Sequence, residues 1–448
     1  MKYGKFLIAL PLLLFTIIRV SGQLNTAKLD SLMDVYEQKN KLMATLAIGH
    51  NEQIVYKRAI GYKWYEGDQK IKSDPLTKYR IGSITKTFTA VMILQLIEEK
   101  KLKLATLLSK YFPKFPNAKK ITIEHLLKHR SGIHNFTDDQ EYLSYMYKQK
   151  TQAELMEVFM KLSSDFEPGE KHVYSNTNYV LLGMIVEKIT KGSYSDALSK
   201  RITGKLGLQN TYCGATSDLN KNESRSYFFD ANNWVFQNET DMSIPLAAGM
   251  IVSTAEDLVK FFEGIFAYQL LKEETVDQMI IQQDGYGMGI NSIPFYETFA
   301  YGHNGSLDGF QSLASYFPNE KVSVAFSANG INVDLNEFLI GVLSIYFNKP
   351  YVIPVFYTFH VPENILKEYA GIYHSEMLKL DFYISMNGNV IMGEAAGQSS
   401  FPLEAKSETK FDYVPAALEI EFIRNISNTV ESFVLKQSGM EFSFTKLK

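Results

Sequence analysis

The 448-residue sequence contains a single cysteine, Cys213, and only two tryptophans. One thiol cannot form an internal disulfide or a thiolate metal cluster, so neither can stabilise this fold. An excess of charge of one sign is also absent, because 46 basic residues stand against 49 acidic ones, for a formal net charge of −3. A protein without a basic field has little attraction for phosphates, which excludes a general nucleic-acid binder.

Long hydrophobic runs are scarce as well. The longest comprises the thirteen residues 6–18, which follow Lys2 and Lys5 and end at Arg19. A membrane span needs ~17–25 apolar residues, so this length and these flanks predict a secretory signal peptide over residues 1–22, cleaved before Gln23. An uncleaved anchor is the alternative. After cleavage we expect a periplasmic or secreted protein without a transmembrane segment.

The spacing of apolar residues after the signal indicates a mixed fold. Helical spacing is expected over residues 29–36, 83–99, much of 120–200, and 335–346. Strand patterns occupy residues 43–50, 53–59, 286–290, 299–303, 311–317 and 322–328. Strands near both ends with helices between them predict an α+β domain over residues 23–350, built on an antiparallel sheet flanked by helices, with a helical subdomain.

The pattern changes after Pro350. Pro354 and Pro362 frame a linker, and beyond it apolar and polar residues alternate strictly, as in residues 380–386, 418–422 and 440–444. Such alternation, punctuated by Asn-Gly and Ser-Gly turn signals, is typical of short antiparallel strands. We therefore expect residues 351–448 to form a linker and a small antiparallel β-barrel.

Three short motifs carry potential chemistry, and the first is Ser83-Ile-Thr-Lys86. Residues three apart share a helix face, so the Lys86 amine can reach the Ser83 hydroxyl and activate it as a nucleophile. The alternative is a helix-cap serine with a solvent-exposed lysine. The same spacing recurs at residues 407–410 and 443–446, where a strand would place the two side chains on opposite faces.

The other two motifs are Tyr174-Ser-Asn176 and Gly302-His303-Asn304-Gly305-Ser306. In an extended segment, residues two apart point the same way, so a phenol and an amide can enter one cleft. Glycines near a strand edge allow a substrate backbone to approach closely. Taken separately, the first of these motifs also fits a core tyrosine beside a turn asparagine. The second, taken separately, is better explained by a turn histidine than by a catalytic one.

The order and spacing of the three motifs are more specific, since Tyr174 lies 91 residues after Ser83 and His303 lies 129 residues after Tyr174. Here the sequence resembles the serine β-lactamase and penicillin-binding-protein superfamily, closest to its class C-like, D-aminopeptidase/esterase-like branch. The likeness covers roughly residues 24–347 and includes the stretches 79–83, 121–132, 248–257 and 305–310. The C-terminal part resembles the lipocalin-like barrels appended to some members of that branch.

The resemblance implies a role for each motif residue. Ser83 would be acylated, and Lys86 would lower the barrier to its deprotonation. Tyr174 would accept and later donate a proton, with Lys86 favouring its phenolate form. Asn176 would orient Lys86 and a substrate amide, and the backbone N–H groups of Ser83 and Ser306 would form an oxyanion hole. The resemblance implies neither a metal nor a cofactor.

One departure from the family pattern concerns the substrate. His303 and Asn304 stand, before Gly305, where the family's β-lactamases and D-Ala-D-Ala peptidases carry lysine and a hydroxyl residue. We expect His303 to line the cleft and titrate near pH 6.5, so that its attraction for an anionic substrate is weak.

These features favour an exported serine hydrolase acting through an acyl-enzyme on a small peptide, including D-amino-acid peptides and cell-wall peptides, or on an ester. A β-lactamase or D,D-carboxypeptidase with a β-lactam-like substrate is the first alternative. A non-catalytic relative that binds peptidoglycan or a partner protein is the second.

Overall fold

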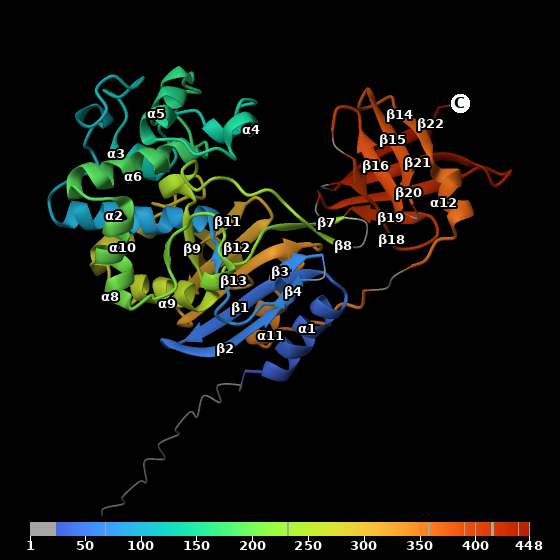
Figure 1. Cartoon of the computed structure of the whole chain (residues 1–448), viewed down its shortest axis with the longest axis horizontal. Helices are drawn as coiled ribbons and strands as arrows, with labels where there is room; N and C mark the ends of the chain where they lie inside the picture. The colour runs from blue at the N-terminus through green and yellow to red at the C-terminus, as the bar shows by residue number, and fades with distance from the viewer. Residues whose placement is uncertain are drawn as a thin grey trace, which may run out of the picture.

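The computed structural model describes residues 24–67, 69–230, 233–356, 359–388, 390–398, 400–413, 416–437 and 439–447. The predicted signal peptide, residues 1–22, lies outside this range. Within it, no helix combines the length and the apolar character needed to cross a membrane. Figure 1 shows a larger mixed body and, beside it, a C-terminal barrel.

A six-stranded antiparallel sheet forms the centre of the larger body, in the order β10-β11-β12-β13-β1-β2. Its strands are β1 (Leu42–His50), β2 (Gln53–Ile60), β10 (Asn291–Phe295), β11 (Thr298–Leu307), β12 (Phe310–Phe317) and β13 (Val322–Ile331). The first strand pairs with the last one along its whole length. The two ends of this domain therefore close the sheet together, as the sequence predicts.

Each face of the sheet is covered by helices. Alternate residues of β1, such as Leu46 and Ile48, pack with α1 (Thr26–Gln38) and α11 (Leu335–Tyr346) on one face. Ala47 points to the other face and joins the core formed with α2 (Thr85–Glu98), α6 (Asn176–Thr190) and α9 (Ala255–Phe266). The predicted α+β class, with helices flanking an antiparallel sheet, is confirmed.

The remaining helices and short strands surround this core. The helices are α3 (Ile123–Leu127), α4 (Tyr142–Tyr145), α5 (Gln152–Lys161), α7 (Tyr194–Leu198), α8 (Gly204–Leu206) and α10 (Glu273–Ile280). The strands are β3 (Tyr62–Glu66), β4 (Gln69–Lys72), β5 (Tyr79–Arg80), β6 (Tyr212–Cys213), β7 (Tyr227–Asp230), β8 (Asn233–Phe236) and β9 (Ile251–Ser253). Helices α3 to α5 lie on the far side of α2 and α6 and form the helical subdomain (Figure 1).

Two expectations about local structure were wrong. Residues 128–141 and 162–175 contain no α-helix, although most of 120–200 was expected to be helical. Residues 286–290 form no strand, because Gly285 and Gly289 adopt φ values of +82° and +74°. A Cβ at Gly289 would lie 2.6 Å from the Cβ of Ala90 on α2. Both irregular regions supply side chains to the site described below.

The C-terminal sheet has nine strands in the order β17-β16-β15-β14-β22-β21-β20-β19-β18, preceded by α12 (Glu363–Tyr369). They are β14 (Gly371–Ser375), β15 (Leu380–Asn387), β16 (Val390–Ala395), β17 (Phe401–Pro402), β18 (Glu404–Ala405), β19 (Lys410–Tyr413), β20 (Leu418–Arg424), β21 (Val430–Gln437) and β22 (Met440–Lys446). Only Leu403 separates the two edge strands in sequence, so the sheet nearly closes into the predicted barrel. Ser407 lies in a bend rather than a strand, and its Oγ accepts a hydrogen bond of 3.0 Å from the backbone N–H of Lys410.

The first residues after Pro350 pack on the larger body. The Phe356 ring lies 5.0 Å from the Tyr36 ring on α1, and the Tyr351 carbonyl accepts a hydrogen bond of 2.7 Å from Lys28 Nζ. A Cβ at Gly341 would lie 2.4 Å from the Tyr351 hydroxyl, so Tyr351 is seated directly on α11. These contacts show that residues up to Phe356 pack on the larger body. The domain boundary at residue 350 stays a prediction.

A chain that ends after Phe356 should therefore be more stable than one that ends after Pro350. The shorter chain loses the apolar contacts of Tyr351 and Phe356, which we expect to lower the free energy of unfolding by about 2 kcal/mol. Urea unfolding of the two truncated chains measures this difference. Equal midpoints and slopes would contradict the packing of this segment on α1 and α11.

Candidate active site

Ser83 lies in a short 3-10 turn, Gly82–Ile84, immediately before α2. Two glycines allow β11 to approach this turn closely. A Cβ at Gly82, where φ is +49°, would lie 2.8 Å from the backbone N of Ser306, and a Cβ at Gly305 would lie 2.9 Å from the backbone N of Ser83. No side chain fits between these backbones, so the peptide groups of Ser83 and Ser306 lie next to each other.

Lys86 follows one turn later, and its side chain is 0% exposed. Its Nζ lies 2.8 Å from Ser83 Oγ, 2.7 Å from Asn176 Oδ1 and 2.9 Å from the carbonyl oxygen of Ala248. Two of these three partners can only accept a hydrogen bond, whereas the serine hydroxyl can also donate. Lys86 Nζ therefore has two fixed acceptors and, at Ser83, a hydroxyl with which it can exchange a proton.

Burial also lowers the pKa of Lys86 well below its usual value of 10.5. Desolvation penalises the ammonium form, and none of the described carboxylates forms an ion pair with it. Burial therefore favours the neutral amine, whose lone pair can take the proton of Ser83. This arrangement is what a general base needs to activate a serine.

Tyr174 stands on the other side of the serine. Its hydroxyl interacts with Ser83, and its ring centroid lies 4.9 Å from Lys86 Nζ. Burial raises the pKa of Tyr174, and the smaller effect of the Ser83 hydrogen bond opposes this only in part. The expected effect of Lys86 on the phenolate stays a prediction, since burial has the largest effect on this pKa. At neutral pH Tyr174 is a phenol, which can donate a proton.

Asn176 is the first residue of α6 and is held at both ends of its amide. Its Oδ1 accepts from Lys86, its Nδ2 donates to Thr137 Oγ1 over 3.1 Å, and its backbone N–H donates to Asn135 Oδ1 over 2.9 Å. The amide orientation is thereby fixed with the oxygen toward Lys86. The expected orienting contact between Asn176 and Lys86 is present.

His303 differs from the expectation. It is 1% exposed, its Nδ1 donates to the carbonyl oxygen of Asn304, and its Nε2 therefore accepts from the Tyr286 hydroxyl over 3.0 Å. Burial, and secondarily Lys86, lower the pKa of His303 to about 3. The prediction that it titrates near pH 6.5 was wrong, because packing against Tyr286 removes the ring from water.

The other predicted residues of this motif line the cleft in different ways. Asn304 and Ser306 are exposed and face the cavity beside Ser83, whereas Gly305 between them is buried against the serine turn. His303 also borders that cavity. The structure thus brings all eight predicted site residues together, but only Asn304 and Ser306 of the third motif present exposed side chains.

Sequence reasoning missed a cluster of rings behind Tyr174. The His129 ring lies 4.3 Å from the Tyr174 ring and 4.8 Å from that of Tyr286. Its Nδ1 accepts from the backbone N–H of Ser175 over 3.1 Å, and burial lowers its pKa well below 6.5. His129 therefore holds the segment that carries Tyr174. Its place in the stretch 121–132 was visible in the sequence, but nothing there indicated this contact.

Ser83 lies between two cavities. One, of about 370 Å³, is lined by Phe136, Thr137, Tyr142, Leu143, Met146, Tyr147, Asn176, Gln237, Thr240, Pro245, Ala248, Gly249, Leu307 and Asp308. The other, of about 400 Å³, is lined by His172, Tyr174, Asp284, Gly285, Tyr286, Asn291, His303 and Asn304. Gly82 adds to the first cavity, and both include Ser83 and Ser306. A scissile bond at the serine can therefore carry a group on either side.

Comparison with known proteins shows similarity to one family and to several hydrolases. A sequence profile of the Beta-lactamase family matches residues 29–334. Teichoic acid D-alanine hydrolase of Staphylococcus aureus is 25% identical over 326 residues, which is 71% of this chain and 78% of the relative.

Solved structures are similar too. The D-stereospecific amidohydrolase from a Streptomyces species is 25% identical with a TM-score of 0.60, over 72% of this chain and 99% of that one. The D-amino acid amidase from Ochrobactrum anthropi SV3 is 26% identical with a TM-score of 0.60, over 70% and 98%. The octameric penicillin-binding protein homologue from Pyrococcus abyssi, 24% identical, shares the fold with a TM-score of 0.64 over 94% and 100%.

The lowered pKa of Lys86 predicts how stability depends on pH. Between its folded-state pKa and the unfolded value near 10.4, the unfolded chain binds one more proton, so the free energy of unfolding rises with pH. Relative to Lys86→Met, the wild type should gain up to about 1.4 kcal/mol per pH unit in this window. Urea unfolding of both proteins at pH 7, 8 and 9 measures the difference. A difference that stays constant with pH would show that Lys86 is protonated in the folded protein.

Proposed function

The chain belongs to the Beta-lactamase family and is a serine hydrolase, and from that premise we propose that it is an exported enzyme that cleaves small D-amino-acid amides, peptides or esters through an acyl-enzyme. The resemblance drawn from the three motifs is confirmed at the level of the family. Support for the D-amino acid comes from the three relatives at 25–26% identity, each named for a D-alanine, D-amino acid or D-stereospecific reaction. Support for export comes from the predicted signal at residues 1–22.

The observation that carries the mechanism is the buried amine of Lys86, whose pKa is lowered by burial, at 2.8 Å from Ser83 Oγ. In this mechanism Lys86 accepts the hydroxyl proton as Ser83 Oγ attacks the carbonyl carbon. The ammonium that forms is held by Asn176 Oδ1 and the Ala248 carbonyl, which lie 2.7 and 2.9 Å away. The two carbonyl oxygens therefore stabilise the ammonium as soon as the amine has accepted the proton.

The remaining groups act on the tetrahedral intermediate. The backbone N–H groups of Ser83 and Ser306, brought together by the two glycines, would bind the oxyanion. Tyr174, a phenol at neutral pH, would donate its proton to the leaving amine or alcohol and recover it from Lys86. Water then attacks the acyl-enzyme with the same groups acting in reverse, so protons balance over one cycle.

A β-lactamase or D,D-carboxypeptidase is the weaker reading. Such substrates present a carboxylate, but no lysine or arginine occurs among the described residues that line the two cavities at Ser83. His303 adds no charge, because its pKa is lowered to about 3. A non-catalytic binding protein is disfavoured by the contacts of Ser83, Lys86 and Asn176, which a mere scaffold does not require.

Ser83→Ala should abolish covalent labelling by a fluorophosphonate and lower kcat on D-alanine p-nitroanilide by roughly 10⁴-fold or more, as removal of a catalytic nucleophile does. The melting temperature should stay close to that of the wild type. Ser443→Ala is the matched control, because Ser443 has the same Ser-x-x-Lys spacing but lies in β22 of the barrel. Labelling that survives in Ser83→Ala, or disappears in the control, would refute the assignment.

Substrate choice should follow stereochemistry rather than negative charge. We expect kcat/KM for D-alanine p-nitroanilide to exceed that for the L-enantiomer by at least about tenfold, a typical discrimination from pocket shape. A fluorescent penicillin should label Ser83 far more slowly than the fluorophosphonate does. Rapid penicillin labelling together with equal rates on the two enantiomers would contradict the proposed substrate and favour a β-lactamase.

A further inference from the structure

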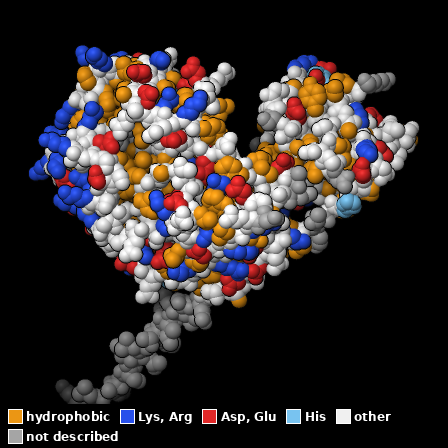
Figure 2. Space-filling model, viewed as in Figure 1, with side chains coloured by type: hydrophobic (Ala, Val, Ile, Leu, Met, Phe, Trp, Pro, Cys, Tyr) orange, Lys and Arg blue, Asp and Glu red, His pale blue; other side chains and the backbone are white. Residues whose placement is uncertain are grey.

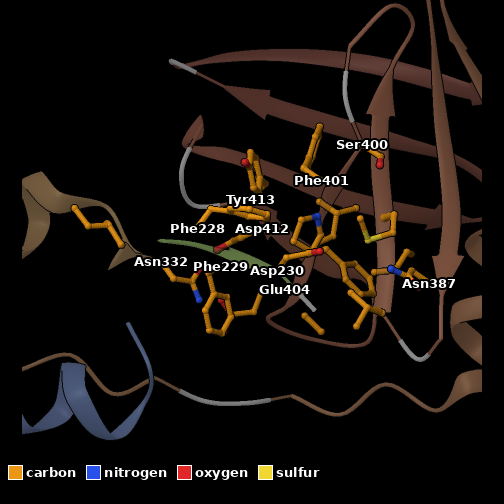
Figure 3. Close-up of a pocket in the computed structure, with 18 of the residues that line it drawn as sticks. Phe228, Phe229, Asp230, Asn332, Asn387, Ser400, Phe401, Glu404, Asp412 and Tyr413 are labelled. Atoms are coloured by element: carbon orange, nitrogen blue, oxygen red, sulfur yellow. The ribbon is translucent and has the colours of Figure 1, made fainter. Parts of the chain in front are cut away.

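A third and larger cavity, of about 720 Å³, lies between the larger body and the barrel. Figure 2 shows a notch between the two bodies, with hydrophobic side chains gathered at its floor. In Figure 3 Phe228, Phe229 and Asp230 come from β7, while Phe401, Glu404, Asp412 and Tyr413 come from the barrel. A cavity of this size is in the range of ligand-binding sites.

The described residues that line the cavity include acidic side chains but no lysine or arginine. Seven aromatic and four acidic residues occur among these 27 residues, together with aliphatic and amide side chains. The aromatic residues are Tyr227, Phe228, Phe229, Phe359, Phe401, Phe411 and Tyr413, and the acidic ones are Asp230, Asp308, Glu404 and Asp412. Aromatic faces and carboxylates both attract a cation, and the rings also contact apolar groups.

Two of the four carboxylates are already engaged. Both oxygens of Glu404 accept from Lys41 Nζ, over 2.8 and 2.7 Å. Asp308 accepts from the backbone N–H and the hydroxyl of Thr240, over 2.9 and 2.7 Å, and also faces Arg80. These contacts hold the walls of the cavity in place and already engage both oxygens of each carboxylate.

The other two carboxylates each have a spare oxygen. Asp230 Oδ1 and Asp412 Oδ1 are buried and have no hydrogen-bond partner among the described residues. Lys406 approaches only the second oxygen of Asp412, at 3.2 Å. Burial raises the pKa of Asp412, and Lys406 opposes this only in part. A buried acceptor without a donor is unfavourable, and a bound N–H group would remove that penalty.

We propose that the cavity between the two bodies binds an ammonium group carried on an apolar stem. The ammonium pairs with the carboxylates of Asp230 on β7 and Asp412 on β19, one from each body. The apolar stem lies against the rings of Phe228 on β7 and Tyr413 on β19. A ligand held in this way contacts both bodies and stabilises their arrangement.

The cavity also adjoins the cleft of Ser83. Gln237 and Asp308 line both the interdomain cavity and the 370 Å³ cavity that contains the serine. The ammonium site is therefore a distal subsite of the same cleft, and a substrate long enough to fill it carries a second amine beyond the scissile bond. This last step depends on the proposed hydrolase function, whereas the binding site itself does not.

Binding is tested with the full-length Ser83→Ala protein and two matched probes, phenethylammonium and 2-phenylethanol, by isothermal titration calorimetry. The amine should bind with a dissociation constant at least tenfold lower than that of the alcohol. The double variant Asp230→Asn/Asp412→Asn should remove this preference. Equal affinity for the two probes, or an unchanged preference in the double variant, would overturn the proposal.

Two further variants separate binding from a general loss of structure. Phe228→Ala removes a ring that is 44% exposed, so it should weaken amine binding severalfold without affecting the fold. Glu376→Gln/Glu441→Gln makes the same change in charge at exposed barrel residues outside the cavity, and amine binding should be retained. Loss of binding in this control, or none in Phe228→Ala, would contradict the site.

The connection to the cleft is tested with wild-type protein and a longer probe. Octylammonium should slow fluorophosphonate labelling of Ser83 severalfold more than 1-octanol does, and the Asp230→Asn/Asp412→Asn variant should lose the difference. Labelling that is unaffected by octylammonium would overturn the role as a subsite. A protein that is not labelled even without amine would instead refute the proposed hydrolase function, and the calorimetric result would stand.

Discussion

Three hydrogen-bond partners surround the buried amine of Lys86, and only the Ser83 hydroxyl among them can donate. The carbonyl oxygens of Asn176 and Ala248 accept from Nζ over 2.7 and 2.9 Å, and Ser83 Oγ lies 2.8 Å from the same nitrogen. Because burial penalises the ammonium and no described carboxylate pairs with it, the neutral amine is favoured in the resting protein. The burial of Lys86 is therefore what allows its amine to activate the Ser83 nucleophile.

The fold supplies this arrangement at several points. Residues Thr85–Leu96 of α2 are all buried, so the helix that carries Lys86 is enclosed on every side and the amine cannot reach water. Gly82 and Gly305 let the sheet edge approach the serine turn, where any Cβ would clash. The neutral ring of His129 packs behind Tyr174 and holds it beside the serine. Helix, sheet edge and irregular segment each contribute one group to the same point.

Much of this could be predicted from the sequence, because periodic patterns report burial directly. Alternation after Pro350 predicted the barrel, and the spacing of Ser83 and Lys86 placed their side chains on one helix face. Properties that depend on packing could not be predicted. The pKa of His303 is set by its burial against Tyr286, and that residue was assigned to a strand that Gly289 does not allow.

The interdomain cavity was equally invisible, since the residues that form it come from β7 and from β16 to β19, more than 150 residues apart in sequence. Alternation identifies which strand residues face a core. It does not identify which part of the barrel the β7–β8 hairpin will contact. The unpartnered oxygens of Asp230 and Asp412 become noticeable only when both bodies are assembled. Sites of this kind arise from tertiary structure alone.

The protonation state of Lys86 tests the account most directly. In a protein labelled with ¹⁵N at the lysine side chains, NMR spectroscopy at pH 7 should show one resonance with the chemical shift of a neutral amine. That resonance should be absent from the spectrum of Lys86→Met. If every lysine instead titrates near pH 10.4, Lys86 is an ammonium ion in the resting protein, and it cannot be the base that activates Ser83.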